Sequence, residues 1–277
     1  MRELATPASL LAALLAVVLP TQAHEHVAAG AASTDPGTPL LFASDDDFGA
    51  ASGYVFTLET GADARYAGFY HGELIMVALP ATPGFGGPDP QHAALGSRVE
   101  AVLESVTGPA GGSFGFWETP GNDLDAEELT FSAAVGETHG THRFPVSEND
   151  GQPGADPYGH IHGRVYSATR PGLYKVGFRF VDTSANGPGG GPIHAPSERF
   201  YLNFQAGLTI AGVAPAAGGI DVTFAATAGK TLQLETSPSI AAVPDWKPIG
   251  DAIAGDDHLH TVTAPTDSTA FFRLVAR

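Results

Sequence analysis

The chain has 277 residues and a formal net charge of −17, from 30 acidic and 13 basic side chains. A surface of this sign repels nucleic acid and anionic lipid headgroups, so we exclude nucleic-acid binding. The chain has no cysteine, which excludes disulfides, thiolate metal sites and thiol catalysis. Glycine (35 residues) and proline (22 residues) are abundant and 43% of the residues are hydrophobic, which favours many short strands joined by tight turns.

The N-terminal segment has the features of a secretory signal peptide. Leu10 to Leu19 form an apolar stretch that is too short to span a bilayer, and Pro20 ends it. Small residues follow at the positions required before cleavage, so we assign residues 1–23 to the signal peptide. We therefore expect an extracytoplasmic protein, in the periplasm, at the cell surface or in the medium, with no transmembrane segment after signal removal. Residues 24–39 are small and polar and predict a flexible arm.

Residues 40–206 predict an immunoglobulin-like, antiparallel β-sandwich. In "LYKVGFRFV" the side chains of Tyr174, Val176, Phe178 and Phe180 alternate with polar ones, as expected for a strand with one face in the core. Several such runs, separated by Gly/Pro-rich loops, are typical of a sandwich. The other expected strands lie in residues 53–60, 73–80, 97–106, 113–118 and 199–206.

Residues 207–277 predict a second, smaller β domain. The segment contains six or seven short strand-like runs and carries seven acidic against four basic side chains. Most of the negative charge therefore belongs to the first domain.

Two histidine motifs in the first domain indicate a metal site. Side chains at positions i and i+2 of a strand point to the same side, so His160, His162 and Arg164 would share one face, and Ile161 and Val165 the other. Two imidazoles on one face can reach a single zinc or copper ion. Supporting ligands could come from His139, His142 and His194, with oxygen alternatives at Glu137, Glu148, Asp150 and Asp156. The competing interpretation is a set of surface histidines bonded to backbone or water.

A second possible metal site lies at the predicted mature N-terminus. Cleavage after Ala23 would expose His24, whose amine and imidazole could bind copper together with His26. The alternative is that these histidines sit on the flexible arm and bind nothing.

The other motifs are weaker indications of a functional site. The segments "SENDG" and "SDDDFG" lack the spacing of a calcium loop, and His258 and His260 in the second domain read as an exposed pair without a role. No nucleophile elbow, zinc-protease motif or phosphate loop is present, so we do not expect an enzyme.

The segment "GHIHGRVYSATRPGLYKVGFRF" resembles the actinobacterial-type surface-anchored repeat domain, whose signature combines H-x-H with P-G-x-Y-x-V. The matching residues are His160, His162, Pro171, Gly172, Tyr174 and Val176. The sequence departs from the family at Val165 and Tyr166, in place of Trp-x-Phe, and at Tyr54, in place of a histidine. The resemblance covers residues 40–206 and implies a β-sandwich displayed at the cell surface. Members of this family are often encoded beside metal transporters, which implies metal binding.

The C-terminal part is similar to small β modules that end secreted bacterial proteins with a "W…IG…FFRL" pattern. Here that pattern corresponds to Trp246, Ile249, Gly250 and residues 271–274. The resemblance implies an accessory or sorting role for this domain.

Two functions follow from these observations. The first is a non-enzymatic, exported protein that binds zinc or copper, with a metal transporter component or another cell-envelope protein as partner. The second is a structural or adhesive surface module without a metal. Convergence of three of the five histidines within about 4–5 Å would favour the first function.

Overall fold

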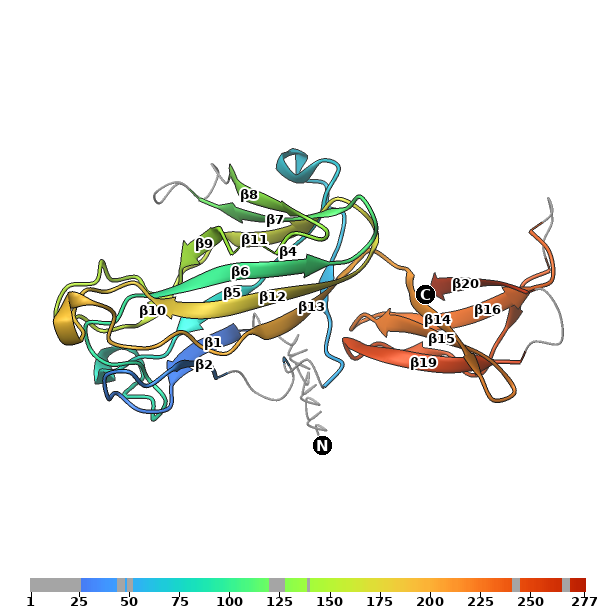
Figure 1. The fold of residues 1–277 in the computed structure, drawn as a ribbon. Coiled ribbons are helices and arrows are strands. Elements are labelled where there is room, and N and C mark those ends of the chain that lie inside the picture. The colour runs from blue at the N-terminus through green and yellow to red at the C-terminus, as the bar shows by residue number, and fades with distance from the viewer. Residues whose placement is uncertain are drawn as a thin grey trace, which may run out of the picture.

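The computed structural model describes residues 26–43, 48, 52–119, 128–138, 140–240, 245–265 and 270–277. These residues form strands and short 3-10 turns with no α-helix (Figure 1), so the prediction of an all-β protein is confirmed. The 3-10 turns are η2 (Ala64–Tyr66), η3 (Pro83–Phe85) and η4 (Pro188–Gly190). In the described ranges, no helix has the length and apolar character needed to cross a membrane.

Three sheets pack around one hydrophobic core in the first part of the chain. The first contains, in spatial order, β10 (Gly159–His160), β5 (Ile75–Ala78), β1 (His26–Ala31) and β2 (Leu40–Phe42). The second contains β4 (Tyr70–Glu73), β11 (Arg164–Ala168), β7 (Ser113–Glu118) and β8 (Glu128–Ala134). The third contains β3 (Phe56–Leu58), β13 (Phe200–Ala206), β12 (Gly172–Asp182), β6 (Val99–Thr107) and β9 (His142–Pro145).

A separate core and two further sheets lie beyond Ala206, on the right in Figure 1. One sheet has the order β14 (Ile210–Ala216), β15 (Gly219–Ala226) and β19 (His258–Ala264). In the other, β16 (Thr231–Ser237) pairs with β17 (Lys247–Pro248), β18 (Ile253–Ala254) and β20 (Phe271–Ala276). We refer to residues 26–206 as the sandwich domain and to residues 207–277 as the C-terminal domain.

The strands with the clearest alternation form the centre of the sandwich domain. In β12 the side chains of Tyr174, Val176, Phe178 and Phe180 are fully buried, while Lys175 is exposed. Phe200, Leu202 and Phe204 of β13 are buried in the same way. The alternation of burial with period two confirms both strands and the face that each turns to the core.

The prediction of a flexible arm is wrong for residues 26–31, because they form β1 inside the first sheet. Val27, Ala29 and Ala31 point into the core and are at most 1% exposed. Small side chains suit this position because the neighbouring chain is close: a Cβ at Gly30 would collide with the Gln91 carbonyl oxygen. The small residues that resembled a linker thus allow close packing.

The antiparallel sandwich also contains two parallel pairs, β1 with β5 and β3 with β13. Parallel neighbours require long crossovers, and the chain between β1 and β5 supplies one that includes β2, β3 and β4. Period-two patterns predict the strands but do not specify which strands become neighbours.

Candidate functional site

His160 and His162 come together as expected, but they do not lie on one continuous strand. Strand β10 ends at His160, and β11 begins only at Arg164. Between them the chain turns at Gly163, whose φ of 71° is in the left-handed region that favours glycine. The two imidazole rings nevertheless stack with centroids 4.6 Å apart and an interplanar angle of 25°. We call these two residues the histidine pair.

The backbone at β10 places His160 beside Glu148. A Cβ at Gly159 would collide with the Val146 carbonyl oxygen, so glycine permits the close approach of the two segments. The Glu148 carboxylate then accepts a hydrogen bond from the His160 N–H, with 2.8 Å between nitrogen and oxygen. Burial, with a contribution from Glu148, raises the pKa of Tyr158 above its usual value. The Glu148 carboxylate therefore holds the backbone, not the ring, of His160.

His142 serves a different part of the surface. It lies on β9, at the edge of the five-stranded sheet, opposite Leu103 of β6. Its Nε2 lies 2.9 Å from Glu137 Oε1, and its ring stacks on Phe131 at 4.6 Å between centroids. His142 thus pairs with Glu137, one of the predicted oxygen ligands, rather than with the histidine pair.

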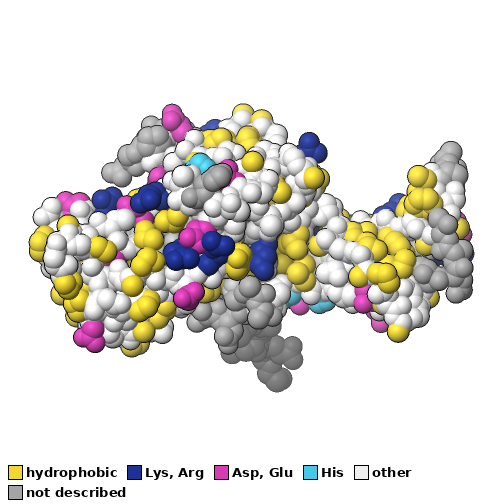
Figure 2. Space-filling view, viewed as in Figure 1, with side chains coloured by type: hydrophobic (Ala, Val, Ile, Leu, Met, Phe, Trp, Pro, Cys, Tyr) yellow, Lys and Arg dark blue, Asp and Glu magenta, His cyan; other side chains and the backbone are white. Residues whose placement is uncertain are grey.

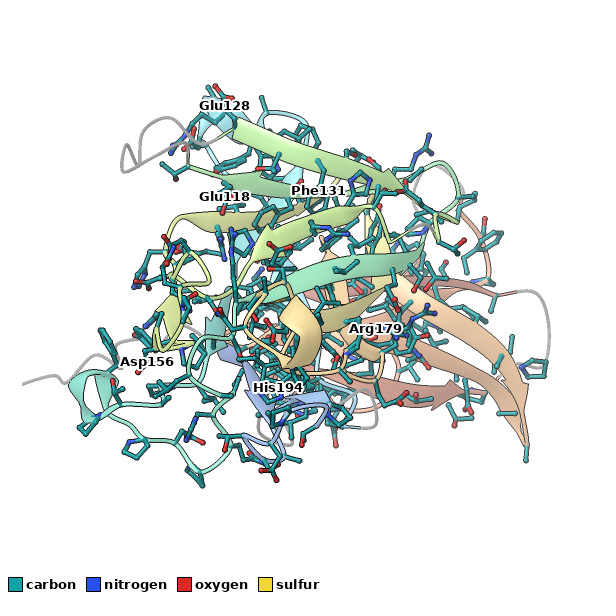
Figure 3. All side chains as sticks on the ribbon, turned by 60° about the vertical axis from the view of Figure 1, so that its left-hand side comes forward. Glu118, Glu128, Phe131, Asp156, Arg179 and His194 are labelled. Carbon is teal, nitrogen blue, oxygen red and sulfur yellow. The ribbon has the colours of Figure 1, made fainter. Side chains whose placement is uncertain are left out.

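His194 is a structural residue of the interior and is only 1% exposed. Its Nε2 accepts a hydrogen bond from the Ala94 N–H at 2.9 Å, which leaves Nδ1 to donate to the Thr38 carbonyl oxygen at 2.9 Å. Both ring nitrogens are occupied by backbone groups, so His194 does not supply a metal ligand in this arrangement. Figure 3 shows His194 beside β1 and β2, the strands that flank Thr38.

The remaining predicted ligands do not add to the pair. His139 and His24 lie outside the described residues, and His26 begins β1, opposite Ile75 of β5. Asp156 Oδ1 accepts hydrogen bonds from the backbone N–H groups of Ala81 and Tyr158. Burial pushes the pKa of Asp156 up, but these hydrogen bonds outweigh it and the pKa is lowered overall. Across the described ranges, no three acidic or histidine side chains form a group that could hold a metal ion.

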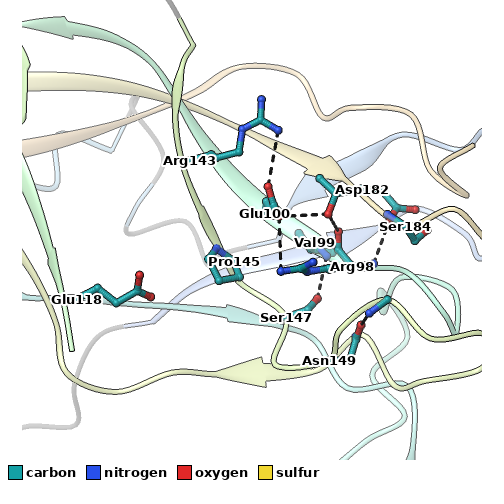
Figure 4. A network of polar contacts seen from close by, with 12 residues as sticks. Arg98, Val99, Glu100, Glu118, Arg143, Pro145, Ser147, Asn149, Asp182 and Ser184 are labelled. Carbon is teal, nitrogen blue, oxygen red and sulfur yellow. Dashed lines mark hydrogen bonds and ion pairs between the residues drawn. The ribbon is translucent and has the colours of Figure 1, made fainter. Parts of the chain in front are cut away.

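The two long loops on either side of the histidine pair are ordered by buried polar contacts. Asp182 accepts hydrogen bonds from four backbone N–H groups, those of Arg98, Ser184, Ile193 and His194. Ser147 accepts one from Val99 and donates one to the Pro157 carbonyl oxygen at 2.6 Å. Figure 4 shows this network together with the ion pairs that join Glu100 to Arg98 and Arg143. In "SENDG" the Asn149 side chain bonds backbone groups as well, so it stabilises the loop.

The position of Arg164 differs most from the sequence prediction. It was expected to share an outward face with the histidine pair, yet its side chain is 1% exposed. Its guanidinium donates to Glu118 Oε1 at 2.5 Å and to the Pro145 carbonyl oxygen at 2.5 Å. It also lies over the Phe116 and Phe144 rings, at 5.8 and 5.4 Å from their centroids. The turn at Gly163 explains why Arg164 faces inward, because it changes which side chains point to the core after His162.

No protein-family model and no curated protein matches the chain. The resemblance to surface-anchored repeat domains therefore stays a prediction. The histidine pair is the candidate site in the described part of the chain, and no third histidine or carboxylate joins it there in a metal-binding group.

Proposed function

We propose that the protein is an exported, non-enzymatic β-sandwich protein that binds one zinc or copper ion at the histidine pair. The observation that carries this proposal is the stacking of the His160 and His162 rings at 4.6 Å on either side of Ile161. Two neutral imidazoles this close together can supply two nitrogen donors to one ion.

The proposed site has few protein ligands, which suits an ion that is delivered and released. Water would complete the coordination sphere, as it does at open zinc sites. The signal-like residues 1–23, the acidic surface and the resemblance to surface-anchored domains support a role in metal acquisition at the cell envelope, with a transporter component as partner.

Metal titration of the chelator-treated protein tests the proposal. Zinc chloride and copper(II) chloride are titrated separately into the wild-type protein and into the double variant His160→Ala/His162→Ala, with binding measured by calorimetry. We expect the wild type to bind one ion and the double variant to bind at least about tenfold more weakly. Binding by the wild type should weaken as the pH is lowered, because protonated imidazoles do not bind metal.

Two matched controls separate this site from the other histidine motifs. The double variant His258→Ala/His260→Ala removes the H-x-H motif of the C-terminal domain and should bind like the wild type. The double variant His24→Ala/His26→Ala tests the N-terminal copper site and should leave zinc binding unchanged. Equal affinity in the wild type and in the His160→Ala/His162→Ala variant would contradict the proposal.

A second candidate function is the structural or adhesive surface module. It is favoured by the contacts of His142 with Glu137 and of His194 with two backbone groups, which give these histidines roles in the fold. Absence of binding to the wild-type protein in the titration would leave this function as the better one.

A further inference from the structure

A cleft of about 1000 Å³ lies where the sandwich domain meets the C-terminal domain. The sandwich domain contributes Tyr54, parts of β3, η2 and β4 with Glu59, Thr60 and Gly61, and Val165 of β11. The C-terminal domain contributes Thr227, Ala228, Lys230 and Asp257. The cleft is distinct from the histidine pair, whose residues do not line it. Clefts of this size between domains are frequent positions of ligand sites.

Backbone hydrogen bonds fix the two walls relative to each other. The Val55 N–H donates to the Asp257 carbonyl oxygen at 2.7 Å, and the Leu259 N–H donates to the Gly53 carbonyl oxygen at 3.0 Å. Between these bonds Tyr54 and His258 form an isolated antiparallel bridge. A cleft whose walls are already held together loses little conformational entropy when a ligand enters.

The charges in the lining disfavour an anionic ligand. Lys230 forms an ion pair with Glu59 across the domain junction, and Arg65 is bound by Asp63 through its Nε and Nη2. Glu73 and Asp257 form no ion pair with a described residue, so the unpaired charge in the lining is negative. These carboxylates would repel an anion and can accept hydrogen bonds from the hydroxyl groups of a neutral ligand.

Aromatic and hydroxyl groups supply much of the remaining lining, together with His71 and Val165. Phe56 is half-buried, and its ring lies against Gly72. A Cβ added at Gly72 would stand 2.8 Å from the Phe56 ring. Tyr54 and Tyr66 border the same space, and Thr57, Thr60 and Thr227 add hydroxyl groups. A sugar ring presents an apolar C–H face that packs on an aromatic side chain, and its hydroxyl groups donate to carboxylates and accept from lysine.

We propose that this cleft binds a neutral oligosaccharide, with Phe56 under a sugar ring and the Glu73 and Asp257 carboxylates accepting hydrogen bonds from its hydroxyl groups. The proposal does not rest on metal binding, because the two sites share no residue. It assigns the C-terminal domain a direct part in recognition, since that domain supplies Asp257 and Lys230.

A microarray of neutral and charged glycans tests the proposal with the full-length protein in the presence of EDTA. We expect binding to neutral glycans, and calorimetry with the best neutral oligosaccharide should give a saturable isotherm. Phe56→Ala removes the aromatic platform and Thr60→Trp fills the cleft from an exposed position. Each should weaken binding by about tenfold or more.

Controls separate loss of the site from loss of the fold. Phe85→Ala removes an exposed aromatic ring that stacks on Tyr158 outside the cleft, and it should bind like the wild type. Far-ultraviolet circular dichroism shows whether each variant is folded. If Phe56→Ala is not folded, Thr60→Trp is the decisive variant. The His160→Ala/His162→Ala variant should keep glycan binding.

Three outcomes would overturn the proposal. They are absence of binding to every neutral glycan, binding restricted to charged glycans, and equal affinity in the wild type and folded Thr60→Trp. None of them bears on the metal titration, so the two proposals fail independently.

Discussion

The role of a single histidine in this protein is set by the partners of its two ring nitrogens. His142 faces a carboxylate, His194 bonds two backbone groups, and His160 and His162 face each other. Motif spacing predicts only the last of these arrangements, because alternation along an extended chain puts residues i and i+2 on one side. The other partners come from segments that the fold brings together.

Replacing His194 with alanine should destabilise the sandwich domain without affecting metal binding. The change leaves the Ala94 N–H without an internal partner, and the Thr38 carbonyl oxygen loses its donor. An unsatisfied buried polar group costs about 1–3 kcal/mol, so we expect the free energy of unfolding to fall by about 2–4 kcal/mol. Urea unfolding measures this free energy. The experiment uses a Trp246→Phe background, in which the buried Trp117 is the fluorescent reporter of the sandwich domain.

His92→Ala is the matched control for His194→Ala. The His92 Nδ1 bonds the carbonyl oxygen of the adjacent Ala93, a contact that water can replace, so the free energy of unfolding should change by less than about 1 kcal/mol. Unchanged stability together with reduced metal affinity in His194→Ala would contradict the structural role and restore His194 as a ligand.

At the scale of elements, the sequence predicts strands well where large and polar side chains alternate. Strands β12 and β13 have this pattern, and their buried faces are the expected ones. Strand β1 lacks it because alanine and glycine carry little hydrophobic signal, although Val27 and Ala29 are as buried as the aromatic core. Close backbone approach selects small residues, and sequence patterns cannot separate that requirement from a linker.

The candidate site, like the strands, can be predicted only in part from the sequence. The spacing of His160 and His162 predicts their proximity, but the turn at Gly163 removes Arg164 from their face. A glycine between two motifs is the one signal in the sequence that indicates such a break. The cleft at the domain junction has no local signature, because its residues come from segments about 170 positions apart.

A charge on the inward face of β1 should test whether residues 26–31 belong to the fold. Val27→Asp places a carboxylate at a fully buried position, so we expect loss of cooperative unfolding of the sandwich domain in thermal denaturation. Ala28→Asp, on the half-buried opposite face, should cost less than about 1 kcal/mol. Equal and small effects of the two substitutions would support the flexible arm that the sequence suggested.

For the whole molecule, only part of the acidic charge is balanced by ion pairs, because 30 acidic side chains face 13 basic ones. Figure 2 shows basic and acidic side chains gathered over the five-stranded sheet, where Glu104 pairs with both Arg179 and Arg199. These pairs are partly exposed, so each contributes about 0–1 kcal/mol. The domain junction differs, because there a carboxylate is half-buried without a basic partner.

That carboxylate belongs to Asp257, which has a φ of 57°, a region where asparagine and aspartate are the most tolerated residues other than glycine. Its carbonyl oxygen accepts the Val55 N–H of the sandwich domain, and its Oδ1 accepts the Ala228 N–H at 2.8 Å. Burial raises the pKa of Asp257 above 3.8, and the neighbouring Asp256 adds to the effect. The folded protein therefore holds the proton of this carboxyl more tightly than the unfolded chain does.

Asp257→Asn should raise the melting temperature of the C-terminal domain at pH 7 by about 1–3 °C. Asparagine keeps the Oδ1 acceptor and the backbone conformation but carries no charge to desolvate. The wild-type carboxyl contributes stability that is present below pH 3.8 and is lost as the pH rises through its raised pKa, so the advantage of asparagine should shrink at about pH 4. Calorimetry at both pH values measures the difference, with the exposed Asp251→Asn as the control that should shift the melting temperature by less than about 1 °C. A gain of equal size at both pH values, or a loss at pH 7, would show that the charge of Asp257 does not strain the junction.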